Sequence, residues 1–159
     1  MDVIVREAVP SDATIWLRLR QRLWPDADPS ELGAHVEDFF GRGSATVAVV
    51  FLAFDAHNAV GFAELSLRPY VPGATSIPAP FLEGWFVEPS ARRQGVGRAL
   101  IRAAERWALE RGHRDLGSDT ILDNESAALA HQALGFREVE RVRFFVKRLE
   151  PDGATVPAS

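Results

Sequence analysis

The stretch RRQGVG at residues 92–97 decides the fold, because it joins an apolar segment to the clearest helical pattern in the chain. The apolar segment, FLEGWFV at 81–87, predicts a strand interrupted by Gly84. The pattern that follows, 98–110, repeats apolar residues at helical spacing and is ended by Gly112. A glycine-containing turn between a strand and a helix directs backbone N–H groups and the positive helix end at one point, so it favours an anion.

Arginines concentrate around this turn. Arg92, Arg93, Arg98 and Arg102 lie within 91–104, which contains no acidic residue, although the whole chain has 18 basic and 22 acidic residues and a net charge of −4. The rest of the chain is therefore acidic. We expect one anion-binding site on a protein whose remaining surface attracts cations, and no nucleic-acid partner.

Two other phosphate-binding motifs fit the turn less well. Gly95 and Gly97 begin a G-x-G, and Asp115 lies at about the distance of a ribose-binding acid, but Leu100 occupies the third glycine position of a dinucleotide motif. The turn also comes more than halfway along the chain, which leaves no second mononucleotide-binding half. No Gly-Lys-Ser/Thr follows the turn, so a P-loop is excluded.

Size and composition predict one domain. The chain has 159 residues, 47% hydrophobic and 25% charged; we place the domain at 1–150 and expect the tail 151–159 to be disordered. No apolar run approaches the roughly 18 residues of a membrane span and the N-terminus does not resemble a signal peptide, so we expect a cytoplasmic protein without membrane contact. The lack of cysteine excludes disulfides, thiolate metal sites and a cysteine nucleophile.

Hydrophobic periodicity predicts strands and helices on both sides of the turn. The expected strands are 3–6, 46–54, 60–67, 81–87 and 115–118. The expected helices are a first one capped by Ser11 or Asp12 and broken by 25–29, a second from Ser30 to Gly41 and Gly43, a third at 98–110 and a fourth at 124–134. Segment 68–80 is expected to be a loop, and 136–149 to be strand-rich with a turn near 139–141.

Two motifs resemble the Gcn5-related N-acetyltransferases. Arg92-x-x-Gly95-x-Gly97 is similar to their acetyl-coenzyme A signature, and 124–136 is similar to their helix followed by Gly-Phe. The resemblance covers residues 3–149. It implies an α/β fold of the mixed α+β kind, with a central, mainly antiparallel twisted sheet, a splayed parallel strand pair and flanking helices. It also implies acetyl-coenzyme A as cosubstrate.

By this resemblance, two segments bind the coenzyme. Main-chain groups of Trp85, Phe86 and Val87 are expected to pair with the pantetheine amides, and an N–H of Phe86 or Val87 to polarise the thioester oxygen. Asn124 is a candidate contact to the pantetheine arm or else only the N-cap of its helix. The pyrophosphate is expected on the turn, formed by Arg92, Arg93, Gln94, Gly95, Val96, Gly97 and Arg98.

An amine attacks a thioester only as the free base, so such a site needs a proton acceptor. Glu83 and Asp119 are the candidates, although Glu83 is equally compatible with a hydrogen-bonded structural carboxylate and Asp119 with a turn or cap residue. His131 stands four residues before Gly135, where many members of the family have a tyrosine general acid; packing or surface exposure is its alternative role. Because the chain lacks cysteine, direct attack in a ternary complex is the simplest route.

Neither metal catalysis nor a serine nucleophile is indicated. The histidines show no H-x-x-x-H spacing, so we expect no metal. Gly117-Ser118-Asp119 is not the G-x-S-x-G turn of a serine hydrolase.

The finer resemblance is to the aminoglycoside 6'-N-acetyltransferases, which confer antibiotic resistance. It is carried by RQRLWPD at 20–26, Tyr70-Val71-x-Gly73, FLEG at 81–84 and SDTILDN at 118–124. It implies a cationic aminoglycoside as acceptor, with Glu83 and Asp119 at the reacting amine and Trp24 and Tyr70 as walls, and it also implies a homodimer. Trp24 has packing of the first helix onto the core as its alternative role.

Two other functions stay open. A related enzyme would acetylate another small amine or a protein amino group. A non-catalytic acyl-coenzyme A-binding regulatory module would bind the coenzyme without turnover of any amine.

Overall fold

The computed structural model describes residues 2–41 and 46–150. Its centre is a five-stranded sheet in the order β1-β2-β3-β4-β5. The strands are β1 (Val3–Glu7), β2 (Val49–Asp55), β3 (Asn58–Arg68), β4 (Ala79–Val87) and β5 (Gly117–Ser118). All neighbours are antiparallel except β4 and β5, which are parallel. The predicted mixed, mainly antiparallel sheet is confirmed.

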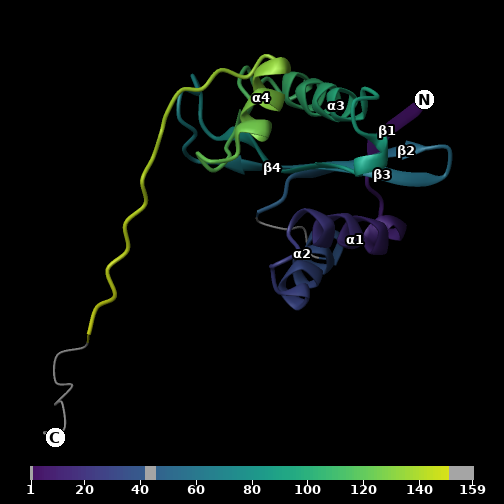
Figure 1. Cartoon of the computed structure of the whole chain (residues 1–159), viewed down its shortest axis with the longest axis horizontal. Coiled ribbons are helices and arrows are strands. Elements are labelled where there is room, and N and C mark those ends of the chain that lie inside the picture. Colours follow the sequence, from purple (N-terminus) through teal and green to yellow (C-terminus); the bar gives the residue numbers. More distant parts are fainter. Residues whose placement is uncertain (1, 42–45, 151–159) are drawn as a thin grey trace, which may run out of the picture.

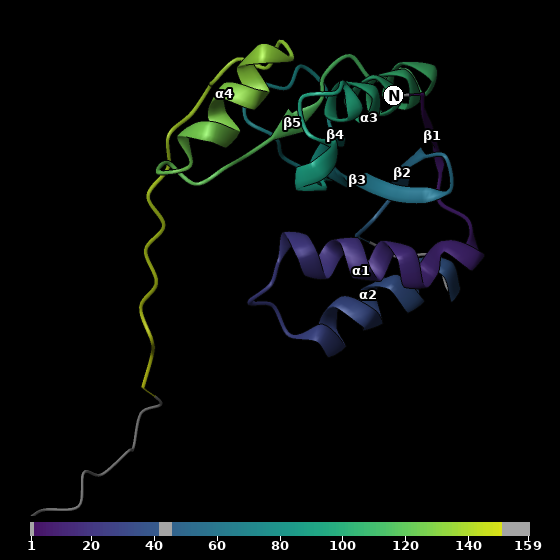
Figure 2. The same ribbon diagram turned by 45° about the vertical axis from the view of Figure 1, so that its right-hand side comes forward.

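Helices cover both faces of this sheet. They are α1 (Ala13–Leu23), α2 (Pro29–Gly41), α3 (Val96–Glu110) and α4 (Glu125–Ala133). In both overall views α1 and α2 lie on one face, and α3 and α4 on the other (Figures 1 and 2). Short 3-10 turns precede α1 (Pro10–Asp12) and α3 (Pro89–Ala91). We call the two sides the α1/α2 face and the α3/α4 face.

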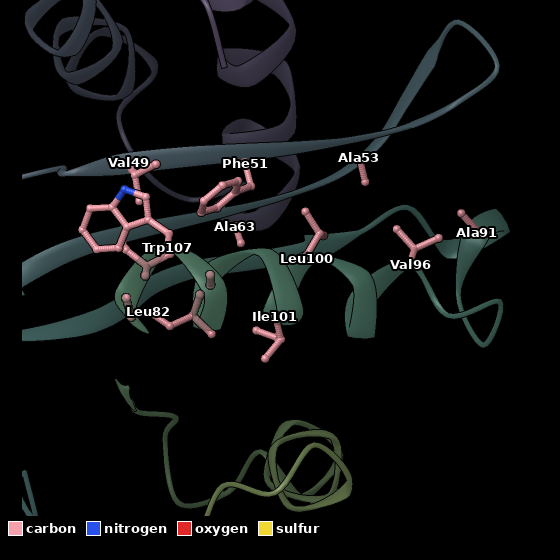
Figure 3. Close-up of a cluster of buried hydrophobic side chains, with 13 residues drawn as sticks. Val49, Phe51, Ala53, Ala63, Leu82, Ala91, Val96, Leu100, Ile101 and Trp107 are labelled. Atoms are coloured by element: carbon pink, nitrogen blue, oxygen red, sulfur yellow. The ribbon is translucent and has the colours of Figure 1, made fainter. Parts of the chain in front are cut away.

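Each face has its own hydrophobic core. Figure 3 shows side chains of the sheet, including Phe51 and Leu82, against Leu100, Ile101 and Trp107 of α3. On the α1/α2 face, Trp16 and Leu19 of α1 pack with other buried side chains that include Phe62 and Phe86. The helical spacing of apolar residues that predicted α1 and α3 therefore corresponds to two separate layers of burial.

A buried ion pair fastens α1 to the sheet. Glu64 on β3 accepts hydrogen bonds from the Trp16 indole (3.0 Å) and Arg20 (3.2 Å), and Arg20 also donates to the Leu32 carbonyl of α2 (3.0 Å). Burial raises the pKa of the Glu64 carboxyl, and Arg20 and Trp16 offset this only in part. Removing one partner of such a pair typically costs about 3–5 kcal/mol, so the position of α1 is strongly specified.

Most element boundaries differ from prediction by a few residues. Helix α3 begins at Val96 rather than residue 98, because Gly95 ahead of it takes a left-handed conformation (φ 85°). Asp12 occupies the N-cap position of α1, but its carboxylate accepts from Arg6 (2.7 Å) and the Val9 N–H (2.8 Å) instead of capping the helix. The predicted stop at Gly43 and the predicted disordered tail 151–159 lie outside the described residues.

The prediction of strands at 136–149 is wrong for this structure. Residues 137–150 form no strand and extend away from the sheet (Figures 1 and 2). Phe144, Phe145 and Val146 are 94%, 91% and 98% exposed. Apolar residues in this segment suit a strand, but a strand needs a neighbouring strand, and no strand of the described chain pairs with this segment. We call 137–150 the C-terminal arm.

Candidate active site

Strands β4 and β5 separate after a very short pairing. Only Phe81↔Gly117 and Leu82↔Ser118 are paired, whereas β4 continues to Val87. The β4 main chain from 83 to 87 therefore has no partner on β5 within the described residues, which confirms the predicted splayed pair. Main-chain groups at 85–87 that point away from β3 are left available for another extended molecule, apart from the Val87 carbonyl, which accepts from Arg92 (3.0 Å).

A β-bulge on β4 sets the direction of Glu83. On β3, Glu64 pairs with Gly84 and the next residue, Leu65, pairs with Leu82, so Glu83 is the extra residue between them. Gly84 faces the α1/α2 side, since a β-carbon there would lie 2.9 Å from the Trp24 indole. Bulges re-aim side chains in this way and are common beside active sites.

The Glu83 carboxylate is already paired on its own face. Arg68 at the end of β3 donates from Nε and from a terminal nitrogen, each over 2.7 Å, and the Ser66 hydroxyl donates over 2.5 Å. Burial alone raises the pKa of Glu83, but the bonds from Arg68 and Ser66 and the Arg68 charge outweigh it, so the net pKa is lowered. Glu83 is thus ionised and hydrogen-bonded, a state that suits fixing a cation better than accepting a proton.

Asp119 directly follows β5, and its charge acts on Arg68. Its negative charge contributes to the raised pKa of Arg68, after the larger hydrogen-bond and charge effects of Glu83. Asp119 is exposed and makes no hydrogen bond or ion pair with the described residues. Both predicted carboxylates therefore act on Arg68, and of the two only Glu83 forms an ion pair with a described residue.

The two predicted aromatic walls differ in how firmly they are held. Trp24 is the C-cap residue of α1, packs edge-on against Phe62 and lies beside Arg20 (5.1 Å to the ring centroid). Trp24 therefore helps to pack the end of α1 on the core, while part of its side chain stays exposed. Tyr70 is 71% exposed on the loop 69–78. That loop is fastened at Thr75, which donates twice to Asp115 (2.8 and 2.6 Å).

The arginine-rich turn has the conformation of an anion site. Gly95 and Arg93 both have positive φ (85° and 60°), and open space surrounds the place of a Gly95 β-carbon. Arg92 donates to the Val87 carbonyl (3.0 Å) and Gln94 to the Ser90 carbonyl (2.9 Å), which fixes the turn to the end of β4. Arg93, Arg98 and Arg102 are exposed and make no ion pair with described residues, so their charges are available.

The second glycine of the turn has a different purpose from the first. A β-carbon on Gly97 would lie 3.0 Å from the Trp85 indole, so Gly97 permits α3 to pack on β4. The Trp85 Nε1 hydrogen is buried without an acceptor among the described residues. Trp85 thus lies beneath the start of α3 on the α3/α4 face, opposite to Gly84 and Trp24.

His131 on α4 meets Trp85 and the end of β5. Its ring is edge-on to Trp85 (5.5 Å between centroids), its Nδ1 lies 2.7 Å from the Ala127 carbonyl, and its Nε2 lies 2.8 Å from the Ser118 hydroxyl. Because a carbonyl only accepts, Nδ1 carries a hydrogen, and Nε2 shares a hydrogen bond with the Ser118 hydroxyl. The Asn124 side chain accepts from the Ala127 N–H (3.1 Å), so Asn124 does cap α4.

Sequence reasoning missed three residues of this site: Arg68, Ser66 and Ser118. Glu64, Ser66 and Arg68 alternate along β3, so period-two spacing places all three on one face. That signal was present in the sequence, but their pairing with Glu83 depends on the bulge, which no local pattern reveals.

The described residues show neither a metal-binding cluster nor a membrane-spanning helix. In 2–41 and 46–150, no three His, Asp or Glu residues group in a way that would hold a metal ion. No helix in that part of the chain combines the length and apolar character needed to cross a bilayer.

The acetyltransferase (GNAT) family model matches residues 14–136. Two curated relatives are aminoglycoside N(6')-acetyltransferases type 1. The protein from Klebsiella aerogenes is 46% identical over 92% of this chain and 97% of its own length. The protein from Stenotrophomonas maltophilia is 46% identical over 92% of this chain and 94% of its length.

Two solved structures share the fold of this chain. AAC(6')-Iy in complex with the bisubstrate analogue CoA-S-monomethyl-acetylneamine matches with a TM-score of 0.85 and 38% identity, over 94% of this chain and all of that one. AAC(6')-Iy in complex with CoA matches with a TM-score of 0.84 and 38% identity, over 93% of this chain and 96% of that one.

Proposed function

Because this chain belongs to the GNAT acetyltransferase family, we propose that it transfers the acetyl group of acetyl-coenzyme A to the 6'-amine of an aminoglycoside. The observation that carries this proposal is the arrangement around β4. Glu83 and Gly84 meet Arg68 and Trp24 on the α1/α2 face, and Trp85 lies under the arginine-rich turn on the α3/α4 face. One strand therefore separates an acidic site from a basic one.

The coenzyme is proposed to lie along the gap between β4 and β5. Its pyrophosphate would meet the N–H groups and arginines of 92–98, while main-chain groups of Trp85, Phe86 and Val87 would take the pantetheine amides. An N–H of Phe86 or Val87 would stabilise the oxyanion. The cap role of Asn124 leaves its NH₂ group available to the pantetheine arm.

The acceptor is proposed to lie on the α1/α2 side of the same gap. A polyamine sugar would place one amine near Glu83 and Asp119, and its ring faces against the exposed parts of Trp24 and Tyr70. The 46% identity to aminoglycoside N(6')-acetyltransferases supports this acceptor over a peptide.

Direct transfer requires two proton movements. The amine nitrogen attacks the thioester carbon, and its surplus proton passes to the Asp119 carboxylate. The carbon–sulfur bond then breaks, and the electron pair leaves on the thiolate. A protonated His131 would return a proton to sulfur through the Ser118 hydroxyl, which donates toward sulfur as it accepts from Nε2.

We also propose that the protein is a homodimer that exchanges its C-terminal arms. Strand β5 is the edge of the sheet and has only two residues, and the arm carries Phe144, Phe145 and Val146 almost fully exposed. A backbone with unpaired groups and apolar side chains in water is a template for pairing with another chain. Two-fold symmetry lets each arm extend the partner's sheet beside β5.

The cytoplasm is the proposed location, since the reaction consumes acetyl-coenzyme A. The absence of cysteine agrees with a protein that does not depend on disulfides.

The test is to incubate purified protein with acetyl-coenzyme A and an acceptor panel, and to follow thiol release. The panel holds aminoglycosides with a 6'-amine, analogues with a 6'-hydroxyl in its place, simple polyamines and peptides. Thiol release with the 6'-amines and none with the 6'-hydroxyl analogues is the expected result. Release on peptides alone would identify a protein acetyltransferase, and coenzyme binding without turnover on any acceptor would identify a regulatory module.

A further inference from the structure

We propose that Arg68 is a positioning residue that, acting through Glu83, keeps the bound acceptor amine in its uncharged, reactive form. The inference rests on the proposed place of the acceptor amine beside Glu83 and Asp119. It gives a role to the Arg68–Glu83 ion pair, which the transfer steps above do not use.

The Arg68 guanidinium is held on two sides. Two parallel hydrogen bonds of 2.7 Å join it to both oxygens of Glu83, and its carbon lies 3.6 Å from the centre of the Phe81 ring. Paired donors and a stacked ring match the planar shape of arginine, which lysine does not share. Arg68 is therefore fixed in place, unlike the usual side chain of a surface ion pair.

The charges around the site leave a small negative balance. Glu83 from β4 forms an ion pair with Arg68, and Asp119 after β5 acts on Arg68 through its charge without pairing with it, so two carboxylates act on one cation. The Glu83 charge contributes to the raised pKa of Glu64 on β3, and Glu64 has its own ion-pair partner in Arg20 from α1. Ser66 adds a hydrogen bond and no charge. The net charge facing the acceptor is thus about one negative unit instead of two.

This balance matters because an ammonium ion cannot attack. Two unpaired carboxylates would attract the cationic substrate more strongly but would also hold its nitrogen protonated. With Glu83 neutralised, Asp119 still attracts the substrate and can take its proton, while Arg68 disfavours a second positive charge nearby. Arg68 therefore weakens substrate binding and favours the free amine.

The test compares Arg68→Gln, Arg68→Lys and a matched control, Arg106→Gln, which removes an exposed positive charge from α3. The pH dependence of kcat is measured with saturating acetyl-coenzyme A and sisomicin. In Arg68→Gln, the fall of kcat on the acidic side of the pH profile should shift to a pH higher by about one unit. The KM for sisomicin at neutral pH should decrease, and kcat at high pH should approach that of wild type. The kcat profile of Arg68→Lys should lie close to that of wild type on the acidic side, and the profile of Arg106→Gln should match wild type at every pH.

Two kinetic results would overturn the inference: an Arg68→Gln profile that overlays wild type, or an equal loss at every pH, which marks a merely structural residue. A second measurement does not need turnover. Calorimetry of sisomicin binding in buffers of different ionisation enthalpy should show more protons released by wild type than by Arg68→Gln.

The two measurements separate this inference from the proposed function. Binding without acetylation would refute the function, and the proton count would still decide the role of Arg68. Equal proton release by both proteins, or no sisomicin binding by wild type, would refute the role of Arg68.

Discussion

The α-carbon of Gly97, in the first turn of α3, lies directly against the indole of Trp85 on β4. A β-carbon at residue 97 would approach Cζ2 to 3.0 Å and Cε2 to 3.4 Å. Both ring atoms belong to a rigid side chain that is partly buried in the α3/α4 core. The packing of helix on strand and the position of the arginine-rich turn therefore depend on the same contact.

Gly97→Ala should weaken coenzyme A binding about tenfold, because overpacking of 1–3 kcal/mol would displace the start of α3. Alanine also favours a helix by about 1 kcal/mol, so the free energy of unfolding should change less than the affinity. Calorimetric titration with coenzyme A measures the effect. Adding Trp85→Leu should recover part of the affinity, and Gly41→Ala, which has open space around it, is the control. An unchanged affinity of Gly97→Ala for coenzyme A would show that the packing of α3 on Trp85 does not control coenzyme binding.

Asp119→Asn and Glu83→Gln should both lower kcat by at least tenfold while leaving coenzyme binding near wild type, but they should differ in stability. Asp119 is exposed without a described partner, so Asp119→Asn should unfold like wild type. Glu83→Gln leaves Arg68 without its counter-ion and should lose up to about 1 kcal/mol, since the pair is partly exposed. Thiol-release kinetics and urea unfolding separate the two effects. Wild-type rates in both variants would reject their proposed roles.

Acid should affect the two neighbouring glutamates in opposite directions. The pKa of Glu83 is lowered in the folded protein, so its stabilising contribution is complete above the unfolded pKa and is lost as pH falls through the folded one. The pKa of Glu64 is raised by burial, so protonation favours the folded state and its contribution improves as pH falls. Between about pH 6 and 3, the unfolding free energy of wild type should fall relative to Glu83→Gln and rise relative to Glu64→Gln. The unfolding free energies are measured by urea denaturation at each pH. If they change with pH in the same way in wild type and in both variants, the two predicted directions are wrong.

Changing the C-terminal arm should dissociate the protein. Phe144→Asp combined with Phe145→Asp puts two charges where the proposed partner sheet requires apolar side chains. Light scattering should give a dimer mass for wild type and a monomer mass for the double variant. Arg141→Gln, which removes only a local pair with Glu138, is the control and should stay dimeric. A monomeric wild type would exclude the exchange.

His131→Ala should lower kcat by about ten- to a hundredfold if the imidazole supplies the thiolate proton. Ser118→Ala should reproduce most of this loss, because Ser118 is the only described group bonded to Nε2. The kcat of each variant is compared with that of wild type from pH 6 to 9. The affinity for coenzyme A is measured as well, to show that each variant still binds the coenzyme. A His131→Ala profile identical to wild type would limit the residue to packing against Trp85 and Phe136.

Regular patterns in the sequence predicted most of the fold. The spacing of Leu100 and Trp107 predicted α3, and the apolar run before the turn predicted β4, because each element buries one defined side. The C-terminal arm shows a case in which the hydrophobic pattern did not predict the structure. Its apolar residues indicate that a neighbour is required, but not whether that neighbour lies in the same chain.

The candidate site was predicted only in part, for a related reason. Glu83, Asp119 and His131 could be selected by residue type and motif position, and the structure brings each to the β4–β5 gap. Arg68 could not, because its bond to Glu83 depends on long-range register between two strands. The difference between a free carboxylate and a paired one is set by that register.

The extra residue in β4 also changes which side chains of this strand share a face of the sheet. Leu82 and Trp85, three positions apart, both point to the side of α3, while Glu83 and Gly84, although adjacent, both belong to the side of α1. Deleting one residue here would restore simple alternation, so that neighbouring side chains of this part of β4 would again lie on opposite faces. Substitutions in this strand can therefore change one face of the sheet at a time, whereas a change of length would alter both faces together.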